Sequence, residues 1–268
     1  MAKIIFRDIA GVKFQDIFIN GERIIDDELC SRVHKAIRQL RKQMPAQYIT
    51  GICEFYGLRL NVTPNVLIPR PETEELVDWI INDNRVCRKK NIRILDIGTG
   101  SGNIAITLKN KIPSAIVTAT DISNRALTVA KENAGIYCTP VKFLRLDILK
   151  RLNWSNRNPI IDKSGQFDII ASNPPYVPLN EKKSLPENVR NFEPHVALFT
   201  EQKNPLIFYD AIGRFALRQL KNNGLLYLEI HETKGKQVKS LLKRLGFGDV
   251  KIKKDINGKD RMVRCGKQ

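Results

Sequence analysis

A strand, a glycine-rich turn and the start of a helix follow one another directly at residues 92–108, and this unit restricts the fold more strongly than any other stretch. The apolar run at residues 92–97 predicts a buried strand, which leads into G-x-G-x-G at Gly98, Gly100 and Gly102. Glycine lets the backbone turn tightly and lets a ligand approach it closely. The unit is typical of an α/β fold with a ligand at the turn. Its spacing differs from the G-x-G-x-x-G of dinucleotide-binding proteins, and a glycine turn alone is a weak signal.

Apolar runs continue to alternate with helical stretches after this unit. We expect the remaining strands near residues 115–120, 141–145, 167–172 and 224–230, with a hairpin-like pair near 249–254 and 261–265. This alternation predicts a mostly parallel sheet with helices on both faces. In such a sheet, ligands bind at the carboxyl ends of the central strands.

Two aspartates stand where predicted strands end. Asp121 closes the run at residues 115–120, where its carboxylate is placed to accept hydrogen bonds from ribose hydroxyls. Asp147 closes the run at residues 141–146, where it could face an adenine amine. The alternative for each aspartate is a helix cap or a solvated loop position.

The residues Asn173, Pro174, Pro175 and Tyr176 follow the apolar run at residues 167–172. Pro174 favours an extended backbone at Asn173, and a proline offers a carbonyl acceptor without an N–H beside it. The side-chain oxygen of Asn173 and a nearby carbonyl can therefore accept both hydrogens of one planar NH2 group, which the ring of Tyr176 can cover. The alternative is a plain turn, because asparagine and proline are common in loops.

The two motifs together predict one reaction. A nucleoside-containing cofactor would lie over the first two strand ends, and an amine or amide acceptor would lie at the end of the fourth strand. S-adenosylmethionine joins the two, because a nitrogen lone pair can attack its sulfonium methyl group in line. An amide nitrogen is a poor nucleophile, so hydrogen bonds from both of its N–H groups would draw charge onto it and orient it. Catalysis would then depend on positioning and electrostatics, without a strong general base.

Several further segments resemble the PrmC (or HemK) family of release-factor glutamine N5-methyltransferases, over most of the chain from about Pro45. They are PAQYITG at 45–51, LIPRPETE at 67–74, the glycine turn, NPPY at 173–176, VRNFEP at 189–194 and AL at 197–198. NPPY is also found in adenine-N6 and other amino methyltransferases. The segments containing IPRPETE and RNFEP are much more discriminating.

The resemblance implies the class I (Rossmann-like), seven-stranded methyltransferase fold. It implies transfer of a methyl group from S-adenosylmethionine to the side-chain amide nitrogen of the glutamine in the Gly-Gly-Gln motif of class 1 peptide-chain release factors. The catalytic positions that it implies are Asn173, Pro174 and Tyr176. The cofactor positions that it implies are Asp96, Gly98, Thr99, Gly100, Gly102, Asp121, Asp147 and Asn173.

The resemblance also implies a substrate-binding set and a wall between the N-terminal part and the active site. The substrate-binding positions are Asn173, Pro174, Pro175, Tyr176, Arg70 and Glu72. Pro71 and Thr73 complete the wall with Arg70 and Glu72. The alternative for Arg70 and Glu72 is a local ion pair that braces the loop.

The N-terminus departs from the family, whose members carry several helices before the PAQYITG segment. Here fewer than fifty residues precede Tyr48. A helix is predicted at residues 27–42, capped by Asp26 or Asp27 and stopped by Pro45. Its apolar residues near one face are Leu29, Val33, Ile37 and Leu40. Residues 4–6 and 14–19 are predicted as short extended pieces.

These segments suggest a division of the chain into three parts. We expect a reduced substrate-recognition segment at residues 1–50, a linking β-hairpin at 51–70 and the methyltransferase domain at 71–268. The hairpin would lie within residues 54–66. The proline-punctuated stretch at 179–204 is predicted to form a flap that faces the substrate.

Composition bears on other functional classes. The cysteines are odd in number and scattered, which indicates reduced thiols in a cytoplasmic protein; they are Cys30, Cys53, Cys87, Cys138 and Cys265. The three histidines show no ligand spacing, so no metal is expected. No run of eighteen apolar residues is present, and charged residues near the N-terminus interrupt any secretory signal, so neither a membrane span nor secretion is expected.

The net formal charge of +17 raises the alternative of a nucleic-acid partner. Residues 232–268 contain twelve lysines and arginines against four acidic residues. A basic surface can attract nucleic acid, and a DNA or RNA adenine methyltransferase would use the same acceptor chemistry on a flipped base. Such an enzyme needs extra protein for target recognition, and the basic residues lack interleaved aromatics. Nucleic acid is therefore possible but not favoured, and a non-catalytic binding protein does not explain two intact motifs.

Overall fold

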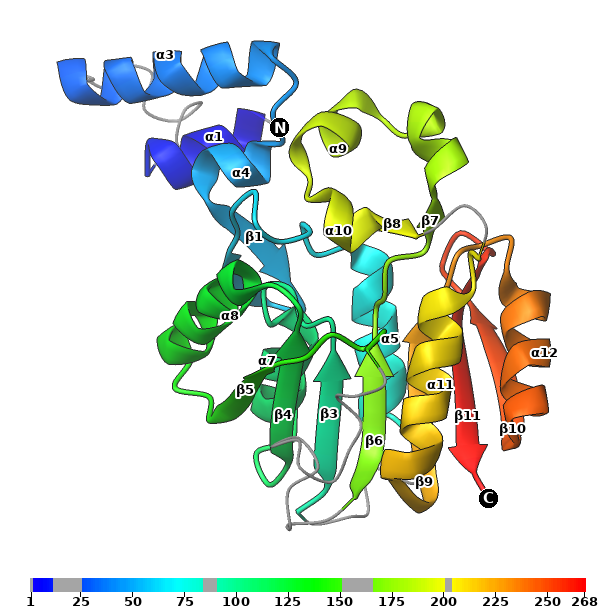
Figure 1. Cartoon of the computed structure of the whole chain (residues 1–268). Coiled ribbons are helices and arrows are strands. Elements are labelled where there is room, and N and C mark those ends of the chain that lie inside the picture. Colours follow the sequence, from blue (N-terminus) through cyan, green and yellow to red (C-terminus); the bar gives the residue numbers. More distant parts are fainter. Residues whose placement is uncertain (1, 12–25, 84–90, 151–165, 201–203) are drawn as a thin grey trace.

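The computed structural model describes residues 2–11, 26–83, 91–150, 166–200 and 204–268. Its centre is a seven-stranded sheet in the order β10-β11-β9-β6-β3-β4-β5 (Figure 1). The strands are β3 (Arg93–Ile97), β4 (Ile116–Asp121), β5 (Val141–Arg145), β6 (Phe167–Ser172), β9 (Leu220–Glu229), β10 (Phe247–Lys254) and β11 (Asp260–Lys267). The five neighbouring strands β9, β6, β3, β4 and β5 run parallel to one another. In contrast, β11 pairs antiparallel with both β9 and β10. The predicted sheet is thus confirmed, with β9 beginning earlier than expected.

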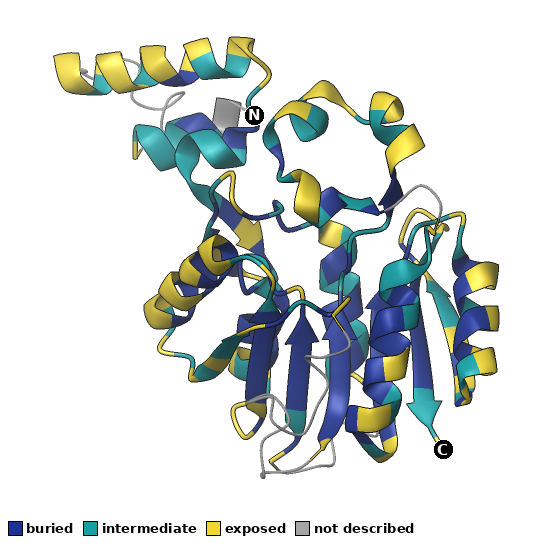
Figure 2. Ribbon diagram, viewed as in Figure 1, coloured by how far each residue is buried: buried dark blue, intermediate teal, exposed yellow. Residues whose placement is uncertain are grey.

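Helices cover both faces of the sheet, as the alternating pattern predicts. Neighbouring residues on one strand point to opposite faces, so Ile94 and Leu95 enter different cores. The core around Leu95 contains side chains of α11 (Ile207–Gln219) and α12 (Gly235–Leu245). The core around Ile94 contains side chains of α5 (Pro71–Ile81), α7 (Asn103–Lys111) and α8 (Asn124–Ile136). Figure 2 shows the strands buried between helices whose outer faces are exposed.

Within the described part of the N-terminal segment, three helices and a hairpin precede the sheet domain. The helices are α1 (Ala2–Ile9), α3 (Asp27–Arg41) and α4 (Ala46–Thr50), and the hairpin pairs β1 (Ile52–Phe55) with β2 (Leu58–Asn61) in antiparallel register. The helix predicted at residues 27–42 is confirmed as α3, and the side chain of Asp26 accepts a hydrogen bond from the backbone N–H of Leu29 at its start. The hairpin predicted within residues 54–66 is present but lies earlier, at residues 52–61. On α3 the buried residue is Ala36, while Ile37 is 39 % exposed.

The extended structure predicted for residues 4–6 is wrong, because these residues lie in α1. Isoleucine favours strands in isolation, but α1 contacts both α3 and α4, and Ile5 is buried in this contact region. Tertiary packing therefore overrides the local preference. Residues 14–19, predicted as a second extended piece, lie outside the described residues.

The stretch after β6 folds into short elements above the carboxyl ends of the strands (Figure 1). They are β7 (Val177–Pro178), a 3-10 helix at Leu179–Ser184, α9 (Glu187–Phe192), α10 (His195–Leu198) and β8 (Phe199–Thr200), with β7 parallel to β8. We call residues 177–200 the flap. The stretch predicted as a flap, 179–204, also includes residues 201–203, which lie outside the described residues, and its contact with a substrate stays a prediction. A hydrogen bond from the ring of His231 to the Glu181 carboxylate, 3.1 Å long, joins the flap to the segment after β9.

Candidate functional site

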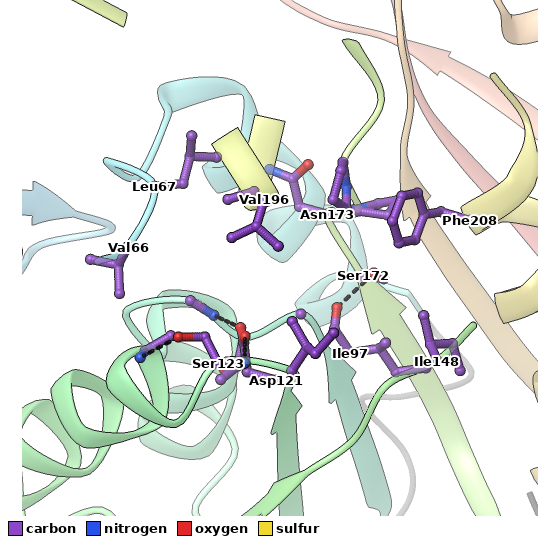
Figure 3. A pocket seen from close by; sticks show the side chains of 18 of the residues that line it. Val66, Leu67, Ile97, Asp121, Ser123, Ile148, Ser172, Asn173, Val196 and Phe208 are labelled. Carbon is purple, nitrogen blue, oxygen red and sulfur yellow. Dashed lines mark hydrogen bonds between the residues drawn. The ribbon is translucent and has the colours of Figure 1, made fainter. Parts of the chain in front are cut away.

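A pocket of about 300 Å³ opens at the carboxyl ends of β3, β4, β5 and β6. Figure 3 shows side chains from the strand ends, the flap and the segment before α5 around it. Residues lining it that belong to the predicted site are Arg70, Gly98, Thr99, Gly100, Asp121, Asp147, Asn173, Pro174 and Pro175. The register of the sheet explains this convergence, because Ile97 at the end of β3 lies between Thr120 on β4 and Ser172 on β6.

The glycine turn holds its shape through left-handed backbone conformations and two clamps. Gly98, Gly100 and Gly102 have φ values of 75°, 55° and 85°, which other residues rarely adopt. The backbone N–H of Gly98 donates to the carbonyl of Thr120 over 2.8 Å. The backbone N–H of Gly100 donates to Oδ2 of Asp121 over 2.9 Å, so β4 holds the turn from one side.

Asp121 presents its carboxylate to the pocket from the end of β4. Its Oδ1 accepts the backbone N–H of Ser123 over 2.9 Å, while Oδ2 accepts Gly100. Burial raises the pKa of Asp121, and these backbone donors oppose the shift. A carboxylate offers about four lone-pair sites, so the group keeps accepting capacity toward the pocket.

Asp96 and Gly102 lie outside the pocket lining, beneath the glycine turn. Asp96 is fully buried, and its Oδ2 accepts the hydroxyl of Thr99 over 2.7 Å. Burial is the main cause that raises the pKa of Asp96 to about 7. A Cβ at Gly102 would lie 2.7 Å from Cδ1 of Ile106 and 3.2 Å from Cβ of Ala130, so this glycine permits close helix packing.

Asp147 reaches the pocket from the loop after β5 and shapes that loop. Its Oδ1 accepts the backbone N–H of Leu149 over 3.1 Å, which is a local turn contact. Ile148 and Leu149 line the pocket beside it, so this wall combines one carboxylate with apolar surface.

The acceptor loop after β6 is held by a chain of three hydrogen bonds. Nδ2 of Asn173 lies 3.1 Å from Oγ1 of Thr73, to which it donates. The Thr73 hydroxyl donates to Oε2 of Glu229 over 2.6 Å, and the Tyr176 hydroxyl donates to Oε1 of the same carboxylate over 3.0 Å. We call these four residues the acceptor wall.

A second cleft adjoins the pocket at Asn173. Residues that line both are Leu67, Arg70, Asn173, Pro174 and Ala197. Tyr176 lines only the second cleft, together with residues of the flap and of the segment after β9. A Cβ on Gly98 would lie 3.9 Å from the backbone carbonyl oxygen of Asn173, so the glycine turn and the acceptor loop meet at van der Waals distance.

Arg70 pairs with Glu193 of the flap, 123 residues away, and not with Glu72. Glu193 is 3 % exposed, and its other oxygen accepts the backbone N–H of Ile68. Burial raises the pKa of Glu193, and Arg70 opposes that shift. The pair joins the flap to the segment before α5, so the local Arg70–Glu72 brace considered above is not the interaction formed. Glu72 itself lines neither cleft.

The sequence predicts Thr73 only as part of the wall formed with Arg70, Pro71 and Glu72, and it does not predict Glu229 as a site residue. What could have revealed Glu229 is its position, because it is an acidic residue at the end of a strand whose last six residues are all buried. A carboxylate in such a position requires hydrogen-bond donors. Thr73 and Tyr176 supply two of them.

Metal ligands, membrane-spanning helices, cysteines and basic side chains bear on the other functions considered from the sequence. Within the described residues, no cluster of three or more histidine, cysteine or acidic side chains could hold a metal, and no helix is long and apolar enough to cross a membrane. The described cysteines are unpaired, whereas Cys87 lies outside those residues. Several basic side chains of the C-terminal segment form ion pairs with acidic residues, among them Lys251, Lys254, Lys259, Arg261 and Arg264.

Comparison with known proteins adds independent information. The family model described as the PrmC N-terminal domain matches residues 1–51, and the model described as the methyltransferase small domain matches residues 81–189. The chain is 43 % identical to a release factor glutamine methyltransferase from Flavobacterium psychrophilum, over 97 % of this chain and 89 % of that protein. The corresponding protein of Bacteroides thetaiotaomicron is 38 % identical over 100 % of this chain and 92 % of its own length.

Solved structures show the same fold at low sequence identity. The human methyltransferase 10 domain containing protein has a TM-score of 0.56 at 16 % identity, covering 90 % of this chain and 96 % of that chain. A methyltransferase from Pyrococcus furiosus has a TM-score of 0.54 at 19 % identity, covering 88 % of this chain and 98 % of that chain. The sheet and its helices are therefore those of the Rossmann-like methyltransferases.

Proposed function

The chain belongs to the release factor glutamine methyltransferase family, and from this we propose that it methylates the side-chain amide nitrogen (N5) of a glutamine in class 1 peptide-chain release factors, at the Gly-Gly-Gln motif. The methyl donor would be S-adenosylmethionine. The reaction would take place in the cytoplasm, on proteins of translation termination.

The orientation of the Asn173 side chain carries this proposal. Because its NH2 group donates to Thr73, its carbonyl oxygen is turned to the opposite side and is free to accept. The backbone carbonyl of Pro174 follows in the chain, and Asn173 and Pro174 line both clefts. Two acceptors at the junction of the clefts fit the two N–H groups of one primary amide.

The first pocket fits the proposed cofactor. The glycine turn leaves room for a ligand against the backbone, and the Asp121 carboxylate can accept hydrogen bonds from ribose hydroxyls. The Asp147 carboxylate suits the polar edge of a planar base, and the apolar side chains of residues 148 and 149 suit its face. Thr99 and Gly100 contact the ligand directly in this assignment, while Asp96 and Gly102 support the turn from beneath. When bound, S-adenosylmethionine supplies a methyl group activated by its sulfonium charge.

The residues of this chain act by positioning. Asn173 and Pro174 would accept hydrogen bonds from both N–H groups of the glutamine amide, which draws electron density onto its nitrogen and points the lone pair toward the first pocket. The ring of Tyr176 would close the other side of the slot. As the N–CH3 bond forms, one of the two protons held by these oxygens passes on to solvent, because amide oxygens are too weakly basic to keep it. Positioning of this kind can supply roughly 7–11 kcal/mol toward lowering a barrier.

The release factor would approach through the second cleft. We propose that residues 1–50 form the substrate-recognition segment, that residues 51–70 link it to the site, and that residues 71–268 are the methyltransferase domain. The Arg70–Glu193 pair would set the position of the flap at the entrance of this cleft. A direct substrate contact by Arg70 or Glu72 stays a prediction.

A methyl-transfer assay tests the function. Labelled S-adenosylmethionine is incubated with the protein and with a purified class 1 release factor or duplex DNA in separate reactions, and the label is mapped by mass spectrometry. Label on the glutamine of the Gly-Gly-Gln motif is the expected result. Label on adenine, with none on protein, would contradict the proposal and support the nucleic-acid alternative.

A further inference from the structure

Three segments that are far apart in the sequence meet at one buried carboxylate. Thr73 is in the first turn of α5, Glu229 ends β9, and Asn173 and Tyr176 belong to the loop after β6. Thr73 and Glu229 are each 1 % exposed. The hydrogen bonds that join the four side chains span 100 residues from Asn173 to Thr73, 156 from Thr73 to Glu229 and 53 from Tyr176 to Glu229.

The direction of these hydrogen bonds follows from the number of protons available. A hydroxyl has one hydrogen, and the Thr73 hydroxyl gives its hydrogen to the Glu229 carboxylate. Its oxygen can therefore only accept from Asn173, which fixes the NH2 group of that amide on the Thr73 side. A flipped Asn173 amide would place two acceptor oxygens against each other in a buried position, which is strongly unfavourable.

The carboxylate of Glu229 serves both hydroxyls because its two oxygens both accept. Burial raises the pKa of Glu229, whereas the hydrogen bonds from Thr73 and Tyr176 and the charge of Arg261 favour the ionised form. A neutral amide at this position would have one accepting oxygen and one donating NH2 group. It could not accept from both hydroxyls at once.

We propose that Glu229 is a positioning residue, which acts through Thr73 to hold the oxygen of the Asn173 amide toward the glutamine acceptor. Through Tyr176 the same carboxylate holds the opposite side of the slot. Glu229 lines neither cleft, so it would act on the reactants only through Thr73 and Tyr176. The inference rests on the proposed function, since it assigns how the acceptor residues are oriented for that reaction.

Thr73→Val tests the central link, because valine has nearly the shape of threonine and lacks its hydroxyl. Thr107→Val is the matched control: Thr107 is fully buried in α7, and its hydroxyl has no hydrogen-bond partner among the described residues. Thr73→Ser restores the hydroxyl without the methyl group. Glu229→Gln removes one of the two acceptors at nearly constant size.

The measurements are kcat and KM for a class 1 release factor, the calorimetric Kd for S-adenosylmethionine, and the melting temperature. We expect Thr73→Val and Glu229→Gln to lower kcat about 10- to 100-fold, the size of effect that a misplacement of about 1 Å produces. The Kd for S-adenosylmethionine should stay within about twofold. Thr73→Ser should recover most of the lost kcat, and Thr107→Val should retain the wild-type kcat.

A double variant separates positioning from general damage. If both residues act through one chain of hydrogen bonds, Thr73→Val with Glu229→Gln should be little worse than Glu229→Gln alone. Fully multiplicative losses, a Thr73→Ser variant as poor as Thr73→Val, or a Kd for S-adenosylmethionine that rises as much as kcat falls would each overturn the positioning role. So would a Thr73→Val enzyme as active as Thr107→Val.

The wild-type reaction distinguishes a failure of the proposed function from a failure of the positioning role of Glu229. If the wild-type protein does not label the release factor, the proposed function fails before any variant is compared. If it does label the glutamine and the Thr73→Val kcat is unchanged, the function stands and the role of Glu229 fails.

Discussion

Two parts of the candidate site, the cofactor wall and the acceptor wall, are built in different ways. The cofactor wall, which is the glycine turn at residues 98–102 with Asp121, is held by contacts between residues 3 and 21 positions apart. The acceptor wall is held by side-chain contacts that span 100 and 156 positions. Backbone shape decides the first wall, and tertiary packing decides the second. Changes to the cofactor wall should therefore alter cofactor affinity or local stability, whereas changes to the acceptor wall should alter catalysis alone.

Asn173→Ala should give the largest effect, because it removes one of the two oxygens proposed to hold the acceptor amide. We expect kcat for the release factor to fall about 10²- to 10³-fold, as when one preorganised polar contact to a reacting group is lost. Calorimetry should show an almost unchanged Kd for S-adenosylmethionine. Asn82→Ala, at the exposed end of α5, serves as the control. A large loss of cofactor affinity would break the separation between the walls.

Asp96→Asn should change how stability depends on pH. Because burial raises the pKa of Asp96 to about 7, this carboxyl contributes stability that is complete below its unfolded pKa, near 4, and is lost as the pH rises through 7. The free energy of unfolding of the variant, relative to that of the wild type, should therefore be about 2–3 kcal/mol more favourable at pH 8 than at pH 5. Urea unfolding at both pH values measures this difference. The same stability difference between variant and wild type at pH 5 and pH 8 would contradict the prediction.

Asp121→Ala should weaken cofactor binding without the catalytic loss of Asn173→Ala. The substitution removes the acceptor of the Gly100 and Ser123 backbone N–H groups as well as the proposed ribose contact. We expect the Kd for S-adenosylmethionine to rise about 10- to 100-fold, corresponding to about 1.4–2.8 kcal/mol. At saturating cofactor, kcat should fall by much less. An unchanged Kd would mean that the cofactor wall does not depend on this clamp.

Gly102→Ala and Gly100→Ala compare two positions of one turn. Both have positive φ, so alanine is strained at each by roughly 1–2 kcal/mol. A Cβ at Gly100 meets nothing within 4 Å, while one at Gly102 lies 2.7 Å from Ile106. The free energy of unfolding should therefore fall by about 1–2 kcal/mol more for Gly102→Ala. Equal losses in denaturant unfolding would show that Ile106 moves aside at no cost.

The same contrast explains how much the sequence could reveal. The strands and the cofactor wall were predictable because their signals lie in short stretches, such as the apolar run that precedes Gly98. The acceptor loop could also be predicted, since the residues at 173–176 directly follow the apolar run at residues 167–172. The division of the chain into three parts and the individual site roles stay predictions.

Interactions between distant segments could not be predicted in this way. The partner of Arg70 is Glu193, and nothing local distinguishes it from the nearer Glu72. Glu229 lies within a predicted strand, but only the folded sheet places its carboxylate between Thr73 and Tyr176. The extended structure predicted for residues 4–6 is wrong for a related reason, because α1 depends on contacts with α3 and α4.

The position of β11 has a consequence for the order in which the protein can mature. This strand lies between β9 and β10 in the sheet although it follows both in the sequence. During synthesis, β10 has no neighbour to pair with until residues 260–267 have left the ribosome. Residues 262–265 are also buried, so the core around α12 stays open until then. Nascent chains that stop before β11 should therefore expose an unpaired strand edge and require protection from aggregation.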